Sequence, residues 1–308
     1  MHRTKGQCDR TILVQKAAGH YFRQESSRVA ITILSQYALQ RAYRKNCQVL
    51  TSDYIEQLAE QGHHHFTTEM AQAALGGTAS AVRTQIRRLR EAGAVASPVR
   101  SFHVIVPPEY RRLGCLPAEH FIHQLMDTWG EPYYVGLLSA AERHGAAHQR
   151  PQALQVMVRR NRRPIACGQV RIDFIARHDL ESMPVQVVST PRGYVRYATP
   201  EVTGLELVGY PNHSGGLSNV ATVLGELAES MTAQLLVDAA ERSPISWAQR
   251  LGYLLETLGR GPLAAALLSL VQARARSDTP LRRAKGVAGG RWNSRWQLII
   301  NTDVEPDL

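Results

Sequence analysis

The sequence predicts an α+β fold in which an N-terminal winged helix-turn-helix is followed by a mixed α/β domain with a mainly antiparallel sheet. The length of 308 residues suits two domains of ordinary size. A short apolar helix, a pair of glycines and a longer basic helix follow one another between residues 66 and 95. Beyond them, β-prone runs alternate with apolar-striped helices. We therefore expect a partly helical extension at residues 1–46, the winged helix-turn-helix at 47–112 and the C-terminal α/β domain at 113–308.

Charge is concentrated in the first third of the chain. The formal net charge is +10 and the pI is near 9.8. Residues 1–112 carry 16 Lys and Arg against 8 Asp and Glu, whereas residues 113–308 carry 20 against 18. This balance favours an acidic partner for the first third, nucleic acid above all. The sequence shows neither a signal peptide nor an apolar run long enough to span a bilayer, so we expect a cytoplasmic protein without membrane contact.

The cysteines give no sign of a metal or redox site. Cys8, Cys47, Cys115 and Cys167 lie far apart and lack the paired spacing of such sites. A reduced compartment is the expected setting.

The N-terminal extension contains one helix-prone stretch, Ser26–Lys45. Ile33, Leu34, Tyr37 and Ala38 fall on one side of it, and its end is basic. We expect this helix to brace the winged helix or to form a dimer contact.

Three helices are predicted next, at 51–62, 66–75 and 78–92. The second is capped by Thr67 and ends at Gly76-Gly77. Its expected buried face is Met70, Ala71, Ala74 and Leu75. In the third, Thr78 is the expected N-cap, Gly93 ends the helix, and Val82, Ile86 and Leu89 form the core-facing stripe.

A β-hairpin, the wing, is expected after the third helix, with its turn at Ser97-Pro98. In a helix-turn-helix the N-terminal half of the recognition helix meets base edges, and later residues meet phosphates. Ser80, Arg83 and Thr84 are therefore the candidates for base contacts, Arg87, Arg88 and Arg90 for phosphates, and Arg100 at the wing tip for a minor-groove or phosphate contact.

The C-terminal domain is expected to begin its sheet with a hairpin over Gln152–Arg177 that turns at Asn161. Arg159, Arg160, Arg162 and Arg163 cluster at this turn. They form either a solvated turn or a second contact with DNA, RNA or a protein partner. Further strands are expected at 185–190, 193–199 and 296–301, and apolar-striped helices at 218–231, 234–243 and 246–259. The helix at Pro262–Ala275 is apolar nearly all round, so we expect it to be buried.

No catalytic, metal or cofactor site is expected. His63-His64-His65 is interpreted as a flexible loop between helices, because no Cys or carboxylate stands near it at ligand spacing. His144 and His148 lack the glutamate that a zinc hydrolase carries beside its first histidine. The serine near histidine in "PNHSGGLSN" has no nucleophile elbow, and Asp173 alone is not a metal site.

A longer resemblance starts at the end of the wing. The stretches "PPEYRRLGCLPAEHFIHQLM", "YYVGLLSAAERHG", "RRPIACGQVRIDFIAR" and "RLGYLLETLG", in this order, resemble the AbiEi family of antitoxins and transcriptional regulators. The similarity extends over residues 187–229 and covers roughly residues 50–308.

The resemblance implies two functions. Family members repress their own operon by binding inverted repeats in its promoter through an N-terminal winged helix. Their C-terminal domain counteracts a nucleotidyltransferase toxin in a type IV toxin–antitoxin, or abortive-infection, system, without requiring a stable complex. The basic recognition-helix positions correspond to Arg83, Arg87 and Arg88, and no catalytic motif is implied.

Two other functions fit the same pattern less well. One is a winged-helix regulator whose second domain senses a small ligand, which a neighbouring nucleotidyltransferase gene would argue against. The other is a nuclease or nucleotidyltransferase with a DNA-targeting domain. The sequence disfavours this one because it lacks clustered carboxylates.

Overall fold

The computed structural model describes residues 52–146 and 151–306. The chain divides into two compact units, Met1–Asp53 and Tyr54–Leu308, and the elements below belong to the second, except for the first two residues of the first helix. The helix predicted at Ser26–Lys45, like the rest of the extension, lies outside the described residues. Within the described ranges, no helix combines the length and the hydropathy needed to cross a bilayer.

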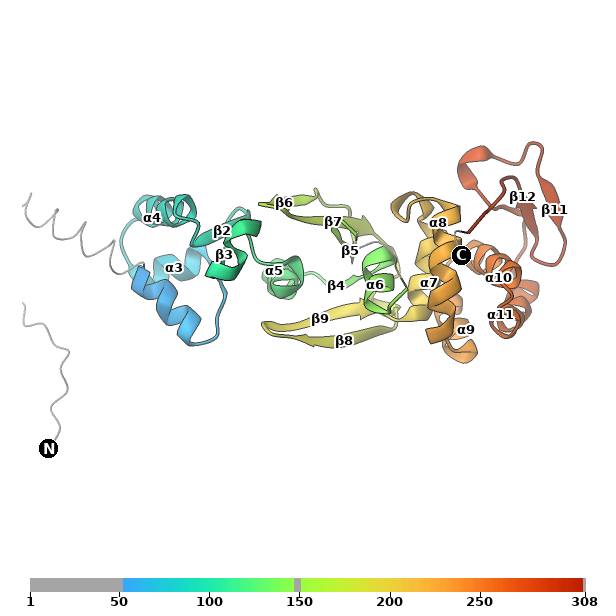
Figure 1. Cartoon of the computed structure of the whole chain (residues 1–308), viewed down its shortest axis with the longest axis horizontal. Helices are drawn as coiled ribbons and strands as arrows, with labels where there is room; N and C mark the ends of the chain where they lie inside the picture. The colour runs from blue at the N-terminus through green and yellow to red at the C-terminus, as the bar shows by residue number, and fades with distance from the viewer. Residues whose placement is uncertain (1–51, 147–150, 307–308) are drawn as a thin grey trace, which may run out of the picture. The chain divides into compact units, whose positions relative to one another are not determined.

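Helices and a small antiparallel sheet make up residues 52–105 (Figure 1). After a helix at 52–60 come β1 (His65–Thr67), α3 (Thr68–Leu75), α4 (Ala79–Glu91), β2 (Val95–Val99) and β3 (Phe102–Ile105). The strand order is β1-β3-β2, and both pairs are antiparallel. The helices and strands share a core that includes Ile55, Phe66, Val82, Ile86 and Val95.

The predicted helix caps are confirmed. The Thr67 hydroxyl accepts a hydrogen bond from the Met70 amide at 3.1 Å, and the Thr78 hydroxyl accepts one from the Ala81 amide at 3.2 Å. Each bond satisfies a backbone N–H that the first helical turn leaves without a partner. The starts of these two helices depend on a capping side chain and an amide only three residues apart, so local sequence predicts them.

Two details of this region differ from the prediction. Only Ala71 of the expected α3 face is fully buried, since Met70 is 45% exposed and Ala74 is exposed as well. The hairpin turns at Arg100-Ser101 rather than at Ser97-Pro98. Pro98 lies inside β2, where the register shifts between Ala96 and Val99. A proline cannot donate a ladder hydrogen bond, so it sits at the irregularity.

A six-stranded mixed sheet forms the centre of the C-terminal part, in the order β6-β7-β5-β4-β9-β8. Three of its five strand pairs are antiparallel. The strands are β4 (Tyr133–Val135), β5 (Leu154–Val158), β6 (Ile165–Cys167), β7 (Val170–Ala176), β8 (Val185–Thr190) and β9 (Gly193–Ala198).

The predicted hairpin over Gln152–Arg177 is wrong. β5 and β7 are neighbours, but they run parallel, with Val156 opposite Phe174. The antiparallel partner of β7 is the short strand β6, which lies on its other side. The chain therefore crosses beyond the position of β7 and then turns back at 168–169 to insert β7 between β5 and β6. Alternation of apolar residues predicts a strand, but it does not name the strand's partner.

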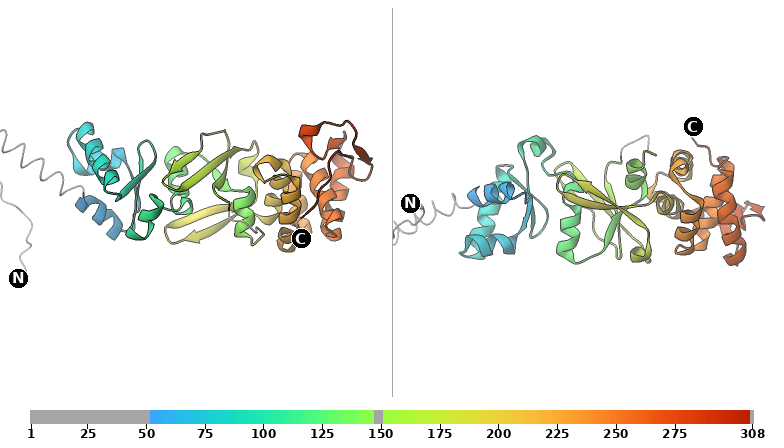
Figure 2. Two further views of the ribbon diagram at one scale, coloured as in Figure 1. Left: turned by 45° about the horizontal axis from the view of Figure 1, so that its top comes forward. Right: turned by 90° about the horizontal axis from the view of Figure 1, so that it is seen from below.

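Helices surround the sheet and continue beyond it. They are α5 (Ile122–Trp129), α6 (Leu137–Arg143), α7 (Pro200–Gly209), α8 (Leu217–Leu227), α9 (Ala233–Glu241), α10 (Ile245–Thr257) and α11 (Gly261–Arg274). α7 is buried from Pro200 to Val208. α9 and α10 pack against it, and α11 packs against α9 and α10 (Figures 1 and 2). Contrary to the prediction, α11 is buried on one side only, through residues such as Leu263, Leu267 and Val271.

A small sheet follows α11, in the order β10-β12-β11. Its strands are β10 (Thr279–Pro280), β11 (Arg291–Asn293) and β12 (Leu298–Ile300). Trp296, between β11 and β12, is fully buried and packs against Gly252 of α10, where a Cβ would lie 2.1 Å from the indole ring.

A buried ion pair joins the sheet to α7. The Arg177 guanidinium donates to the Glu206 carboxylate at 2.7 Å, and the two side chains are 3% and 0% exposed. Tyr134 of β4 donates its hydroxyl to the same oxygen at 2.5 Å. Burial raises the pKa of the Glu206 carboxyl, while Arg177 and Tyr134 oppose that shift by stabilising the carboxylate. The pair thus holds together three elements that are distant in sequence.

Two glycines meet where the hairpin region joins the large sheet. Gly168, in the turn between β6 and β7, has φ of +58°, and a Cβ there would lie 2.1 Å from the Leu113 carbonyl oxygen. Gly114 approaches it from the other chain segment, and the Gln169 amide donates to the Leu113 carbonyl at 2.8 Å. Only a residue without a side chain fits this contact.

We expect Gly168→Ala to lower the free energy of unfolding by about 3 kcal/mol, because it combines left-handed backbone strain with a backbone clash. Gly130→Ala is the matched control, since Gly130 has φ of +64° but nothing within 4 Å of its Cβ position. It should cost only about 1 kcal/mol. Urea unfolding measures both, and equal losses would show that the glycine contact does not hold the junction.

Candidate nucleic-acid interface

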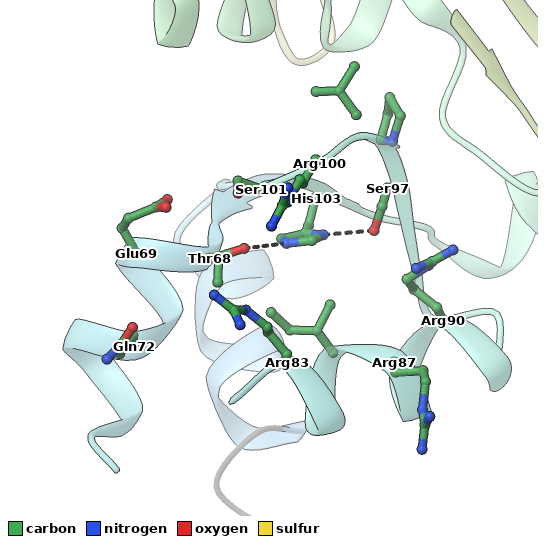
Figure 3. Close-up of a pocket in the computed structure, with 13 residues that line it drawn as sticks. Thr68, Glu69, Gln72, Arg83, Arg87, Arg90, Ser97, Arg100, Ser101 and His103 are labelled. Carbon is green, nitrogen blue, oxygen red and sulfur yellow. Dashed lines mark hydrogen bonds between the residues drawn. The ribbon is translucent and has the colours of Figure 1, made fainter. Parts of the chain in front are cut away.

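A groove of about 590 Å³ lies between α3, α4 and the β2–β3 hairpin. Figure 3 shows the side chains that line it. α4 contributes Arg83, Ile86, Arg87 and Arg90, and the hairpin contributes Arg100. The remaining lining residues are Thr68, Glu69, Gln72, Ser97, Pro98, Val99, Ser101 and His103. Three elements separated in sequence therefore form one basic concavity.

Helical spacing brings the α4 arginines to this groove. Arg83, Arg87 and Arg90 recur at i, i+4 and i+7, which is one face of a helix. Val82 and Ile86 are buried at 3% and 4% exposure, and they fix the rotation of α4 against its core. In Figure 3, Arg83 and Arg100 approach His103, whereas Arg87 extends away from it. Arginine side chains from both α4 and the hairpin thus line the groove.

His103 forms the floor of the groove and ties its walls together. Its Nε2 lies 3.0 Å from the Thr68 hydroxyl oxygen, and its Nδ1 lies 2.7 Å from the Ser97 hydroxyl oxygen. Burial, and then the Arg90 guanidinium, lower the pKa of His103 to about 4, against the opposing effect of Glu69. The imidazole is therefore neutral at physiological pH and bridges the start of α3 to β2.

The charge of the groove is strongly positive. Arg83, Arg87, Arg90 and Arg100 face a single carboxylate of the lining, Glu69. Arg87 also contacts Glu91 at 3.6 Å, but both side chains are about two-thirds exposed, at 68% and 67%. An exposed i, i+4 pair of this kind is weak and gives way readily to a phosphate. The groove can therefore hold a polyanion.

Three predicted contact residues, Ser80, Thr84 and Arg88, lie outside the groove lining. The Thr84 hydroxyl donates to the Ser80 carbonyl at 2.9 Å, so this hydroxyl is engaged within the helix. Arg88 is exposed in the last turn of α4, on a different side from the lining arginines. Sequence reasoning missed Thr68, Gln72 and His103 as lining residues. The β-prone run that contains His103 predicts a strand but not the groove beside it.

The second basic cluster is partly neutralised. Arg159 pairs with Glu181, and both are exposed. Arg162 donates Nε to Glu131 at 2.9 Å and Nη2 to its other oxygen, and its guanidinium lies 4.1 Å from the centre of the Trp129 ring. Arg162 therefore has a packing role. Arg160 and Arg163 are exposed and Arg159 is held only by an exposed pair, so three of the four side chains remain accessible to a partner.

The histidine run is not a flexible loop. His65 begins β1, and His64 is only 5% exposed. Burial, with neighbouring His65 and Arg192, lowers the pKa of His64 to about 4. The His144 ring lies 2.8 Å from the Ala198 carbonyl through Nε2, where it donates in the matching tautomer. Among the described residues, no three His, Cys, Asp or Glu side chains are placed to share a metal ion.

Acid should destabilise the fold through His64 and His103. Both have folded-state pKa values near 4, below the ordinary value of 6.5, so the unfolded chain binds protons more readily between these values. Above pH 6.5 neither state is protonated, and stability is full. As the pH falls from 6.5 to 4, we expect a loss of about 3 kcal/mol per histidine.

Urea unfolding at pH 7.5 and at pH 4.5 measures this loss. The first pH lies above the ordinary histidine pKa of 6.5, and the second lies just above the folded-state values near 4. The variant His103→Gln keeps an amide able to hydrogen bond but does not titrate, so its stability should depend less on pH. The exposed His178→Gln is the control. If His103→Gln and the parent lose the same stability over this interval, burial of His103 is not a source of the acid sensitivity.

The comparisons with known proteins concern mainly the C-terminal part. Residues 134–257, from β4 to the last residue of α10, match the family model of the AbiEi antitoxin C-terminal domain, as the resemblance predicts. The groove residues, 68–103, precede this range. The crystal structure of the RV2827C protein from Mycobacterium tuberculosis is similar, with a TM-score of 0.60 and 18% identity over 82% of this chain and 91% of that one. At this identity the likeness is one of fold. A comparison with curated proteins finds no match.

Proposed function

The domain at residues 134–257 belongs to the AbiEi antitoxin family, and from this premise we propose that the whole chain is both an antitoxin and a DNA-binding repressor of its own operon. The family gives the chain an antitoxin role and implies a toxin as its functional partner. The proposal adds that residues 47–112 are a winged helix-turn-helix and that the toxin is a nucleotidyltransferase. It places the chain in a type IV system, in which antitoxin and toxin need not form a stable complex.

One observation carries the DNA-binding half of this proposal. Arg83, Arg87 and Arg90 of α4 and Arg100 of the hairpin converge on one groove. A recognition helix places its side chains in the major groove, and a wing reaches the adjacent backbone or minor groove. Cations that come from both elements match the phosphates on either side of one docking site.

The arrangement of α3 and α4 supports the same reading. A short helix, a turn at Gly76-Gly77 and a longer helix form the motif, and both glycines have positive φ, at +66° and +81°. Within one chain this motif supplies one reading helix. Inverted repeats in the promoter therefore imply two chains per operator, with half-sites separated by roughly one helical turn of DNA or a multiple of it.

Footprinting and gel shift on the region upstream of the gene test the repressor half. The full chain should protect two inverted half-sites and should bind them in preference to an unrelated duplex. Equal affinity for both duplexes would mean that the groove holds DNA without reading it, and the repressor assignment would fail.

Co-expression tests the antitoxin half. The neighbouring nucleotidyltransferase should stop growth when it is expressed alone, and growth should return when this chain is supplied with it. Size-exclusion chromatography of the two purified proteins should show separate peaks. If growth does not return, the chain does not counteract this enzyme.

A further inference from the structure

We propose that the small sheet after α11 carries a binding surface for single-stranded nucleic acid, distinct from the α4 groove. The surface is the basic lobe, residues 279–295. It contains Arg282, Arg283, Lys285, Arg291 and Arg295 and no acidic residue. It also contains Trp292, which is 61% exposed. Cations for phosphates beside an exposed aromatic ring for stacking are what single strands require.

The basic lobe is a fixed structure held on α10. The Gln249 side-chain amide donates to the Gln297 carbonyl at 2.8 Å and to the Trp296 carbonyl at 3.2 Å. The Gln249 carbonyl oxygen accepts from the Thr279 hydroxyl at 2.7 Å. Arg250 donates Nε to the Pro280 carbonyl at 3.1 Å. Buried polar bonds of this kind set one position for the lobe, so its surface is preorganised.

Asn301 brings the two basic segments of the lobe together. Its amide donates to the carbonyls of Arg282, at 2.8 Å, and of Gly286, and its oxygen accepts from the Arg282 amide at 2.9 Å. Asn301 directly follows β12, whose residue Ile300 pairs with Arg291 of β11. The turn at 282–286 and the strand β11 are therefore anchored beside the same end of β12.

Most cations of the lobe are available to a ligand. Arg295 is the exception, because it pairs with Glu256 at 2.9 Å. Within residues 52–146 and 151–306, no carboxylate pairs with Arg282, Arg283, Lys285 or Arg291. The positive charge of the lobe also affects the buried Arg250. Burial, and then repulsion from nearby Arg283, lower the pKa of Arg250. A phosphate backbone would relieve this repulsion.

Trp292 is placed for stacking rather than for packing. Its Nε1 donates to Asp278 at 3.0 Å, which holds one edge of the ring while most of the residue stays in solvent. Its neighbour Trp296 is fully buried and supplies the core of the small sheet. Exposure of a large apolar ring to water is unfavourable, and stacking against a nucleic-acid base would bury the ring.

Fluorescence anisotropy with the full chain and labelled oligouridine tests the proposal. An oligothymidine of the same length separates RNA from single-stranded DNA, and a duplex of that length reports double-strand binding. Trp292→Ala should weaken oligouridine binding by roughly tenfold or more, and Trp292→Phe should retain most of it. Arg283→Ala with Lys285→Ala should reduce the slope of log affinity against log salt by about 1.4, since each single-strand phosphate contact contributes about 0.7.

The charge-matched control is Arg143→Ala with Arg171→Ala, two exposed arginines on α6 and β7. It should leave the affinity for oligouridine within about twofold of the parent. Oligouridine should also quench the fluorescence of Trp292, and this quenching should disappear in Trp292→Phe although binding persists. Single-strand binding that the lobe variants lose and the control keeps supports the proposal.

Two results overturn it. One is the absence of single-strand binding at low salt. The other is single-strand binding that the lobe variants leave unchanged. Because the lobe variants leave Arg83, Arg87, Arg90 and Arg100 intact, they should still shift the promoter duplex. A failure of this proposal is therefore distinguishable from a failure of the repressor assignment.

Discussion

Alanine at both Arg83 and Arg87 should abolish the gel shift of the promoter duplex at about 150 mM salt. The two side chains leave the same face of α4 and line the groove with Arg90 and Arg100. Losing one base contact and one phosphate contact costs about 3 kcal/mol together, which lowers affinity by roughly a hundredfold or more. Neither residue belongs to the core of this region, so α4 should stay folded.

The single variants separate reading from anchoring. Arg87→Ala should weaken binding to every duplex alike and should reduce the salt slope by about 0.9. Arg83→Ala should reduce the preference for the operator over an unrelated duplex, because Arg83 lies nearer the N-terminal half of α4. Arg274→Ala, an exposed arginine at the end of α11, is the control and should keep the shift. A shift that survives in the double variant would remove α4 as the recognition helix.

Glu206→Gln should have the largest effect on stability, with an expected loss of about 4 kcal/mol in the free energy of unfolding. The substitution preserves volume but leaves the Arg177 guanidinium buried at 3% exposure without an opposite charge. Ser243 and Met183 still contact Arg177 through Nη2, yet neither carries a charge to replace the carboxylate. Urea unfolding at neutral pH measures the loss.

Glu229→Gln is the matched control. Glu229 pairs with Arg260 at 3.1 Å, but its side chain is 72% exposed, so solvent screens the pair. Its loss should stay below about 0.5 kcal/mol. The double variant Arg177→Met with Glu206→Leu removes both buried charges, and it should recover part of the stability that Glu206→Gln loses. Equal losses for Glu206→Gln and Glu229→Gln would mean that the buried pair does not hold α7 to the sheet.

Local features of the fold could be predicted from the sequence. Thr67 and Thr78 cap their helices through bonds to amides three residues away, so the signal lies within a few residues. The stripe of Val82, Ile86 and Leu89 follows from helical periodicity alone, and the structure packs it in the core as expected. The arginine face of α4 follows from the same periodicity.

Features that depend on distant partners could not be predicted. β5 reads as a strand, but the insertion of β7 beside it in parallel depends on pairing across a crossover. The hairpin turn was misplaced because Ser97-Pro98 is a common turn pair, whereas the true tip uses Ser101 with φ of +71°. Arg162 belongs to a basic run, and only the fold brings Glu131 and Trp129 to it.

The candidate site shows the same division. Sequence spacing identified the helix face with Arg83, Arg87 and Arg90, because such a face is a local property, and it assigned Arg100 to the hairpin although it misplaced the turn. It did not identify His103, whose partners Thr68 and Ser97 come from two other segments. The position of His103 at the floor of the groove therefore depends on tertiary packing. The positive charge of the groove follows from arginines that local sequence spacing identifies.

The central claim is that the chain combines two separable functions, DNA binding and antitoxin activity. The most direct test measures the growth of cells that express the nucleotidyltransferase from an unrelated inducible promoter. The parent chain and the double variant Arg83→Ala with Arg87→Ala are supplied in parallel at equal levels. Both should restore growth equally, because the match to the AbiEi antitoxin family lies at residues 134–257, whereas the α4 groove lies outside this range. Rescue by neither chain, or rescue by the parent alone, would contradict this division of function.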